Sequence, residues 1–545
     1  MAFCEQCGAK LTAGTKFCEE CGAAVEMPSG EKNGNCEALD ATERGPSARN
    51  STFKGEEWPS KWRAAAQDCG RNDLGLIITR ENALLKQIGE NAHADYDELI
   101  DGYITSAKRR GISYYYLDLD GCPFYRGDGD VESVVAALHK LVAIARPKYL
   151  MILGNEEIVK TAVWNNPAYD PEGDSDRCVE GDFCYAVLDA NSPAGGQSYD
   201  FDELLRVGRV CSCAGEGLVS FARYFENAAR HAGRMGRVEA YGLSALVWQD
   251  ESNAEFRTVS HKNVDVSPGV TKEMVAQRIP VEANLLFFNL HGSADTKYWY
   301  GQKGGSYPQA FEPDVLNGAS ASYFLGVEAC YGARYLGGLP IDQSIVQTAL
   351  RNGCLAFLGS SEIAYGSPHP KGTCADIVVG EYIRHIDAGC SAGDAFLRGL
   401  EQLVKNAGTS MDDTDAKTFM EFSLYGDPSV SMRSSQKGVF GKGFLGKGVS
   451  KGIRIPMPDV RRAVDLALAE VDAKIESLVD GYVAENVLSE IPAEDFFKSA
   501  AQQVFKVGQT GLNVKRYRYV EGAMSQIVKV YFDEKGGVTK AALSK

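Results

Sequence analysis

The sequence has no long hydrophobic run. No stretch approaches the roughly 18–20 consecutive apolar residues that a membrane span needs, so we expect no transmembrane helix. Its first residues, MAFCEQCGAK, contain neither a basic leader nor the apolar core of a signal peptide. We therefore expect a cytoplasmic protein, in which the 15 cysteines are mostly reduced thiols rather than disulfides.

Positive charge is also scarce. The formal net charge of -16 repels a phosphate backbone, so we expect no nucleic-acid partner.

The sequence lacks a Gly-x-Ser-x-Gly motif, which argues against a serine hydrolase. An acidic segment, DPEGDSD at 170–176, offers oxygen ligands for calcium, but such runs are more often solvated loops.

Length and patterning predict an α/β protein of several parts. A chain of 545 residues exceeds the roughly 100–200 residues of an ordinary domain. Near-continuous apolar runs alternate with amphipathic helical patterns, which indicates a mostly parallel sheet covered by helices on both faces. The predicted strands are 74–79, 113–120, 149–154, 238–248, 283–290, 322–329 and 354–360, and the predicted helices include 131–147, 217–234 and 344–353.

Composition divides the chain further. Residues 26–57 are rich in Gly, Ser, Asn, Pro and charge, which is typical of a flexible linker, and the Gly/Lys-rich residues 436–452 form a second linker. Between them, 58–435 carries the α/β pattern. Residues 453–545 predict a small α+β module of unknown role, with helices at 458–487 and 492–506 followed by strands.

The N-terminal residues contain an internal repeat. FCEQCG at 3–8 and FCEECG at 17–22 place two Cys-x-x-Cys pairs with ten residues between them. Four thiolates suit tetrahedral zinc, and about 25 residues have little core without a metal. We expect residues 1–25 to be a zinc ribbon whose zinc is structural, and we expect no cofactor for catalysis. The predicted ligands are Cys4, Cys7, Cys18 and Cys21.

Two apolar runs end in potentially reactive side chains. ANLLFFNL is followed by His291 and Gly292, and SYFLGVEA is followed by Cys330. In parallel sheets, active residues gather beyond the carboxyl ends of strands. A thiolate can attack a carbonyl while a nearby imidazole transfers the proton, and an adjacent imidazolium lowers the pKa of the thiol. Taken alone, a buried cysteine is usually a small apolar residue, so the pairing with His291 matters.

The order of these motifs resembles that of a known family. Strand–His-Gly followed by strand–Ala-Cys is similar to the caspase and gingipain clan of cysteine peptidases, and EACYG at 328–332 is close to the caspase pentapeptide Q-A-C-[RQG]-G, with Glu328 and Tyr331 as departures. The gingipain-like branch is the nearer one, through Trp299 after HGS and through segments occurring in that branch's order. These segments are YLMILG (149–154), EGDFCYAVLD (180–189), RVGRV (206–210) and SLYGDPS (423–429). The resemblance covers about residues 70–435.

The resemblance implies roles for individual residues. His291 becomes the general base and acid, Cys330 the nucleophile, and the amides of Gly292 and Cys330 the oxyanion hole. In that family, an acid in a loop upstream of the histidine binds the P1 side chain, the residue whose carbonyl is attacked. The corresponding stretch WQDESNAEFR does not align uniquely, so the candidates remain Asp250, Glu251 and Glu255.

The resulting hypothesis is a cytoplasmic cysteine endopeptidase (hydrolase) of caspase-like fold, acting on a polypeptide substrate through an acyl-enzyme thioester. Gingipains are secreted with a prodomain, whereas this sequence begins with a predicted ribbon and linker. This difference favours a regulated peptidase, and we expect a protein partner to bind to the ribbon or to the C-terminal module. One alternative is a catalytically silent caspase-like scaffold that recruits partners through its zinc ribbon. The other is an enzyme acting on small thioesters or amides.

Overall fold

The structure, a computed structural model, describes residues 58–433 apart from short internal gaps, together with several strands outside that range. Those strands lie at 2–3, 10–11, 453–454, 489–491, 514–521, 524–532 and 538–544, the last followed by Lys545. The predicted zinc ligands, both predicted linkers and the predicted helices at 458–487 and 492–506 lie outside the described residues. The chain divides into two compact units, Met1–Asn50 and Ser51–Lys545. In the first unit, β1 (Ala2–Phe3) pairs antiparallel with β2 (Lys10–Leu11).

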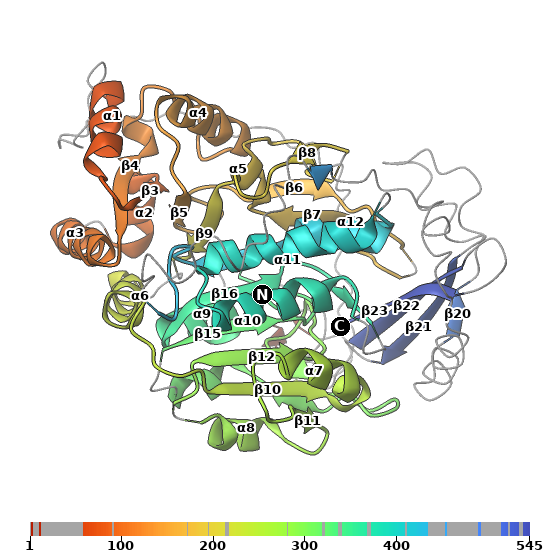
Figure 1. The fold of residues 1–545 in the computed structure, drawn as a ribbon. Coiled ribbons are helices and arrows are strands. Elements are labelled where there is room, and N and C mark those ends of the chain that lie inside the picture. Colours follow the sequence, from red (N-terminus) through yellow and green to blue (C-terminus); the bar gives the residue numbers. More distant parts are fainter. Residues whose placement is uncertain are drawn as a thin grey trace. The chain divides into compact units, whose positions relative to one another are not determined.

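A ten-stranded sheet forms the centre of the second unit (Figure 1). Neighbouring strands run parallel except at one position, where β16 and β18 are antiparallel. The sheet therefore consists of two parallel blocks of opposite direction, and the prediction of a mostly parallel sheet is confirmed. Its strands, in spatial order, are β11 (Asp265–Ser267), β10 (Ala240–Ala245), β12 (Leu285–Asn289), β15 (Tyr323–Val327), β16 (Cys354–Ser360), β18 (Phe422–Gly426), β9 (Arg206–Val210), β5 (Tyr149–Leu153), β3 (Asp73–Thr79) and β4 (Ile112–Asp118).

Helices cover the sheet. Every residue of β12, β15, β16 and β18 is buried, which requires cover on both faces and explains why these strands read as continuous apolar runs. Helices α10 and α11 cross the front of the sheet in Figure 1. The helices described are α1 (Trp58–Asp68), α2 (Glu81–Ile88), α3 (His93–Arg109), α4 (Val131–Ile144), α5 (Phe183–Val187), α6 (Leu218–His231), α7 (Gln249–Phe256), α8 (Lys272–Arg278), α9 (Ile345–Arg351), α10 (Ala375–Asp387), α11 (Ala392–Ala407) and α12 (Asp413–Glu421).

Strands β12 and β15 are direct neighbours in the sheet. They run parallel, with Phe288 opposite Val327 near their carboxyl ends. The chain leaves both strands at the same edge within the next few residues, so His291 and Cys330 emerge side by side. This adjacency is the arrangement that the sequence predicted for the two strands.

A second, antiparallel sheet joins the C-terminal strands to the α/β region. Its order is β17, β23, β22, β21, β20, and β17 is a two-residue strand that follows β16 in the chain. The three long C-terminal strands agree with the apolar and β-branched runs of the sequence. The bounds are β17 (Tyr365–Gly366), β20 (Ser489–Ile491), β21 (Val514–Glu521), β22 (Met524–Phe532) and β23 (Val538–Ser544).

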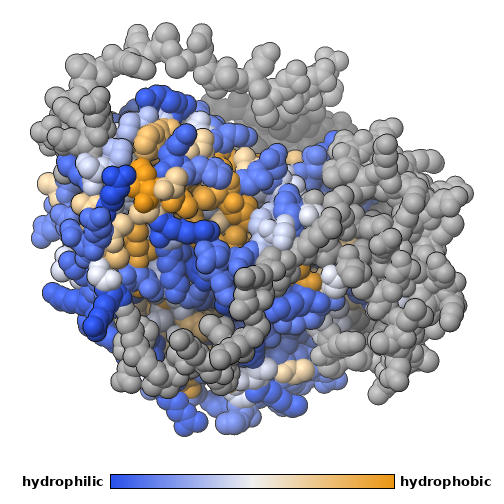
Figure 2. Space-filling model, turned by 45° about the horizontal axis from the view of Figure 1, so that its top comes forward, coloured by the Kyte–Doolittle hydropathy of each residue, from blue (hydrophilic) through white to orange (hydrophobic). Residues whose placement is uncertain are grey.

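The visible described surface in Figure 2 is mainly hydrophilic, with one band of apolar residues. Val163 and Val219 are the large apolar side chains that stand most exposed among the described residues. None of the described helices combines the length and the apolar character needed to cross a bilayer.

Candidate active site

His291 is held firmly just after β12, and it is almost completely buried. Its main chain exchanges two hydrogen bonds with Tyr300, of 2.9 and 2.8 Å. Its Nε2 lies 2.7 Å from Oε1 of Gln302, and the indole of Trp248 packs on the imidazole with 4.3 Å between ring centroids. Because an amide oxygen only accepts, Nε2 carries the proton of the neutral ring and Nδ1 keeps the lone pair.

Cys330 lies at the start of a strained turn after β15. Its Sγ is 3.5 Å from the carbonyl oxygen of Ala364. The next residue, Tyr331, has φ 50°, a left-handed conformation that is rare for a residue with a side chain. The N–H of Tyr331 donates to the carbonyl of Glu362 at 2.8 Å, and its hydroxyl donates to Asp176 at 2.5 Å. The turn is thus fixed by both the backbone and the side chain of Tyr331.

Asp176 belongs to the acidic segment weighed above as a calcium site. The structure gives this segment another partner. The Nζ of Lys417, completely buried, lies 2.6 Å from Asp174 and 3.3 Å from Asp176. Asp174 also accepts from the hydroxyl of Tyr365 at 3.0 Å. Asp174 and Asp176 therefore take part in an internal ion-pair network near Cys330, so the segment is not wholly a solvated loop. Calcium binding by this segment stays a prediction.

Burial shifts the pKa of each candidate reactive group toward its neutral form. Burial lowers the pKa of His291 to about 3, and the charge of Lys545 acts in the same direction. Burial raises the pKa of the Cys330 thiol above its usual range. Among the described hydrogen bonds, none joins Cys330 to His291. The sequence-based expectation of a thiolate next to an imidazolium therefore stays a prediction.

Two backbone amides converge on one oxygen atom. The carbonyl oxygen of Lys545 accepts from the N–H of Cys330 at 3.2 Å and from the N–H of Gly292 at 3.4 Å. Gly292 can have no side chain here, because a Cβ would lie 1.7 Å from the carbonyl oxygen of Cys330. The pair of amides proposed from sequence as an anion pocket does bind a carbonyl oxygen.

The side chain of Lys545 enters a buried pocket of carboxylates, which we call the acid pocket. Its Nζ lies 2.8 Å from Asp376, 3.1 Å from Glu328 and 3.7 Å from Glu251. The ring of Trp248 lies 4.5 Å from the same nitrogen, so this indole contacts both the lysine and His291. The acid pocket consists of Glu251, Glu255, Glu328 and Asp376, whose carboxylate oxygens lie within 4.8 Å of one another.

Helix α7 explains which of the three sequence candidates reach the acid pocket. The stretch expected to be a loop is helical, so Glu251 and Glu255, four residues apart, lie on one face. Both belong to the pocket, whereas Asp250 is exposed and outside it. Sequence reasoning missed Glu328 and Asp376. The sequence did contain a signal for Glu328, because this residue replaces the Gln of the caspase pentapeptide.

The acid pocket needs a cation. Burial raises the pKa of Glu328 to about 8, with the charge of Lys545 opposing, and it raises those of Glu251 and Glu255 well above the usual range. Burial alone would lower the pKa of Lys545, but the carboxylates of Asp376, Glu328 and Glu251 raise it well above its usual range. The ammonium is therefore charged, and its charge opposes the rise that burial causes in the pKa values of Glu328 and Glu251.

The main chain around Lys545 is that of a bound, extended peptide. Strand β23 pairs antiparallel with β17, with Ser544 opposite Tyr365 and Leu543 opposite Gly366. The N–H of Lys545 donates to the carbonyl of Ala364 at 2.9 Å. Lys545 is thus held in three ways: by pairing of its main chain, by the acid pocket around its side chain, and by the two amides at its carbonyl oxygen.

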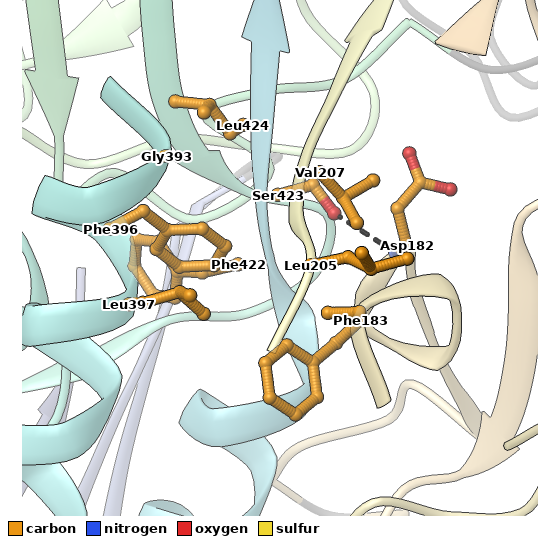
Figure 3. Close-up of a pocket in the computed structure, with 11 residues that line it drawn as sticks. Asp182, Phe183, Leu205, Val207, Gly393, Phe396, Leu397, Phe422, Ser423 and Leu424 are labelled. Carbon is orange, nitrogen blue, oxygen red and sulfur yellow. Dashed lines mark hydrogen bonds between the residues drawn. The ribbon is translucent and has the colours of Figure 1, made fainter. Parts of the chain in front are cut away.

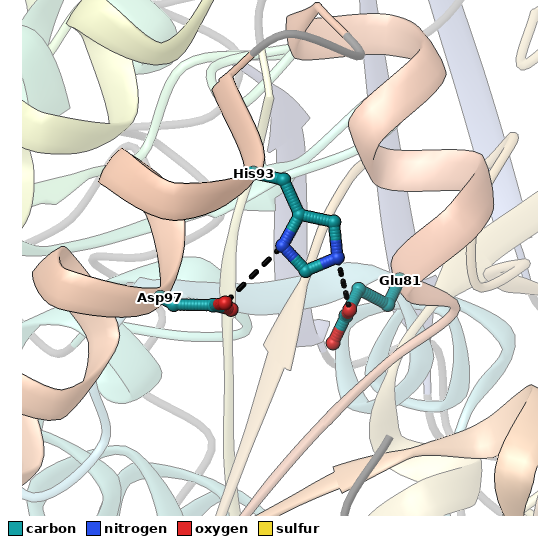
Figure 4. Close-up of side chains that lie close together, drawn as sticks. All are labelled: Glu81, His93 and Asp97. Atoms are coloured by element: carbon teal, nitrogen blue, oxygen red, sulfur yellow. Dashed lines mark hydrogen bonds and ion pairs between the residues drawn. The ribbon is translucent and has the colours of Figure 1, made fainter. Parts of the chain in front are cut away.

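Two other groups of residues lie outside the candidate active site and offer less support for a function. Figure 3 shows a small pocket between α11, β9 and β18, lined mainly by apolar side chains such as Phe183 and Phe396. Figure 4 shows His93 between Glu81 and Asp97, at 3.3 and 3.2 Å. Asp97 is largely exposed, so this trio is a surface ion-pair cluster, although its atoms are also near enough to share a metal ion.

Comparison with solved structures finds likenesses at low identity. The complex of the Porphyromonas gingivalis RgpB pro- and mature domains shares 12% identity, with 67% of this chain and 80% of that chain covered and a TM-score of 0.47. Gingipain R (RgpB), described as an Arg-specific cysteine proteinase, also shares 12% identity, with 67% and 79% covered and a TM-score of 0.45. No sequence among the curated proteins matches the chain.

The N-terminal repeat matches a family model. The zinc-ribbon domain model aligns with residues 3–25. The chain therefore carries a zinc-ribbon domain at its N-terminus, as the spacing of the cysteines predicted. The donor set of four thiolates suits a tetrahedral zinc ion.

Proposed function

We propose that this protein is a cysteine endopeptidase that cleaves polypeptides after lysine, with Cys330 as nucleophile and His291 as the proton-transferring base. One observation carries the proposal. Lys545 has its carbonyl oxygen on the amides of Cys330 and Gly292 while its ammonium lies in the acid pocket. The P1 residue of a substrate has the same two requirements, a carbonyl oxygen on backbone amides at the nucleophile and a side chain in a specificity pocket.

The mechanism follows from these positions. The sulfur of Cys330 attacks the P1 carbonyl carbon, and the thiol proton passes to Nδ1 of His291, whose Nε2 stays bonded to Gln302. The negative charge on the former carbonyl oxygen is stabilised by the two amides. The C–N bond then breaks, and His291 gives the proton to the leaving amine. Water adds to the thioester in the same way and releases the P1 carboxylate.

The acid pocket favours lysine over arginine. The ammonium meets three carboxylates and the face of Trp248, all around a single nitrogen. Lysine is a compact point charge, whereas a guanidinium is a planar fork that requires paired acceptors. We therefore expect lysyl substrates to be preferred over arginyl ones by about tenfold or more.

A labelling experiment tests the proposal. A lysyl ketone probe that alkylates cysteine nucleophiles is incubated with the full chain and with its Lys545→Ala variant, and the modified residue is located by mass spectrometry. We expect modification of Cys330 and hydrolysis of lysyl peptides, both lost in Cys330→Ala but retained in Cys178→Ala, since Cys178 is an exposed thiol elsewhere. If neither chain is labelled at Cys330 and neither cuts a lysyl peptide, the peptidase assignment fails.

A second function is favoured by the protonated thiol. Since burial raises the pKa of Cys330 and none of the described hydrogen bonds links it to His291, the same site suits a silent scaffold that binds lysyl peptides without cutting them. Binding of such a peptide by wild type and Cys330→Ala alike, with no cleavage by either chain or by Lys545→Ala, would identify this case. We further propose that Cys4, Cys7, Cys18 and Cys21 hold a structural zinc ion and that the ribbon recruits a regulatory protein.

A further inference from the structure

We propose that the C-terminal segment 538–545 is a built-in ligand of the substrate cleft, so that the protein as folded holds its own site closed. The inference rests on the proposed function, because it assigns this segment to the positions that a substrate would take. Three independent sets of contacts carry it.

The first set is the orientation of the segment. β23 runs toward Cys330 and ends with Lys545 in the acid pocket, so residues 541–545, Ala-Ala-Leu-Ser-Lys, occupy the acyl side of the cleft. Pairing with Tyr365 and Gly366 uses the main chain that any extended substrate would need. A second peptide cannot bind there until this strand leaves.

The second set anchors the segment to helix α12. The Nζ of Lys540 lies 2.5 Å from Asp412 and 2.8 Å from Asp415. On the adjacent strand β22, the buried Nζ of Lys529 lies 2.7 Å from Asp413. Two lysines therefore meet a cluster of acids at the start of one helix, which holds the C-terminal sheet against the α/β region.

The third set reaches the partner of the candidate base. The amide of Gln302, which holds His291 at 2.7 Å, donates to Oε1 of Gln526 in β22 at 3.1 Å. Tyr307 also contacts Gln526 at 3.3 Å. The C-terminal sheet thus touches the histidine side of the site as well as the pocket, and its departure removes contacts on both sides.

A tethered ligand is a strong competitor. A segment attached to the same chain acts at an effective concentration of about millimolar, without any new contact. A free peptide of the same sequence should therefore bind the folded chain about tenfold or more weakly than it binds a chain whose tail cannot fill the pocket.

The test uses binding rather than cleavage. Fluorescence anisotropy of labelled Ala-Ala-Leu-Ser-Lys is measured with full-length Cys330→Ala and with Cys330→Ala combined with Lys545→Ala. We expect the Kd to fall by about tenfold or more in the double variant. The matched control, Lys262→Ala in the Cys330→Ala chain, removes an exposed lysine and should leave the Kd unchanged. Lys545→Glu, whose carboxylate is repelled by the acid pocket, should behave like Lys545→Ala, and circular dichroism confirms folding.

The outcomes separate this inference from the proposed function. Equal Kd values for Cys330→Ala and for Cys330→Ala with Lys545→Ala overturn the built-in ligand. In that case, equally fast cleavage of lysyl peptides by wild type and by Lys545→Ala leaves the peptidase assignment intact. No binding to any folded variant overturns the lysine pocket itself and the inference with it. Tighter binding in the double variant without any cleavage by Lys545→Ala supports the built-in ligand at a silent site.

Discussion

The Nζ of Lys545 lies 2.8 Å from Oδ1 of Asp376, and both side chains are completely buried. Asp376 lies in the first turn of α10, which covers β15, so the pocket acid comes from a part of the chain remote from both reactive residues. A buried ion pair of this kind is expensive to break from one side, because the remaining charge stays desolvated.

Removing one charge of the pocket should weaken lysine recognition. In a chain with the pocket freed by Lys545→Ala, we expect Asp376→Asn to lower kcat/KM for a lysyl reporter by about 10- to 100-fold, since a buried partner of the ammonium is lost. Asp250→Asn is the matched control, because Asp250 is exposed on α7 outside the acid pocket. An equal loss in both variants would show that the pocket does not bind P1.

A side chain at position 292 should abolish turnover. Gly292→Ala places a Cβ against the carbonyl of Cys330 and displaces an amide that faces the developing negative charge, so we expect kcat to fall by about 100- to 1,000-fold. Gly102→Ala on helix α3 meets no atom within 4 Å and serves as control. Unchanged kcat in folded Gly292→Ala would exclude this amide from the site.

Residues added after Lys545 should be removed in cis. Because the carbonyl of Lys545 already lies on the two amides, a chain extended by Gly-Ser and a fluorescent reporter protein should be cut after Lys545. The reaction should be first order, with a rate independent of protein concentration, and it should be lost in Lys545→Ala. A rate that rises in proportion to concentration contradicts cleavage within one molecule.

Stability should fall as pH rises toward the folded-state pKa of Glu328. Burial raises that pKa to about 8, against about 4.3 in an unfolded chain, so the folded state binds more protons between these values. The stabilisation is fully present below about pH 4.3 and is lost as pH rises through about 8, at up to about 1.4 kcal/mol per pH unit. Denaturant unfolding from pH 5 to 8 should show a smaller slope in Glu328→Gln. An unchanged slope would refute the assignment.

Loss of a ribbon thiolate should release zinc. Cys18→Ser in the full chain is expected to remove one zinc ion per chain, measured by elemental analysis after dialysis, because a tetrahedral site needs all four sulfurs. Cys36→Ser, which changes a cysteine of the predicted linker, should keep the metal. Equal zinc in both variants would place the ion elsewhere.

Much of the sheet was predictable, because buried parallel strands read as continuous apolar runs. The strand predicted at 354–360 matches β16, and those at 74–79 and 149–154 match β3 and β5 within a residue. The strand at 238–248 is wrong at its end, since the chain turns into a 3-10 helix after Ala245 and positions Trp248 over His291. Local pattern does not show where a tertiary contact stops a strand.

Only part of the candidate site could be predicted, because local sequence patterns do not show tertiary contacts. His291 and Cys330 follow recognisable apolar runs, and Glu328 lies two residues before the cysteine. Asp376 is far along the chain, and only packing of α10 on β15 brings it near. Nor could composition reveal that Lys545 supplies the cation, because long-range pairing of β23 with β17 has no local signal.

Strand β17 lies outside the ten-stranded sheet, and both of its residues pair with β23. Under the proposed function, replacement of β23 by a substrate would leave the pairing of the ten central strands unchanged. Tyr365 of this strand is completely buried and hydrogen-bonded to Asp174, so the edge on which β23 pairs is itself part of a folding core.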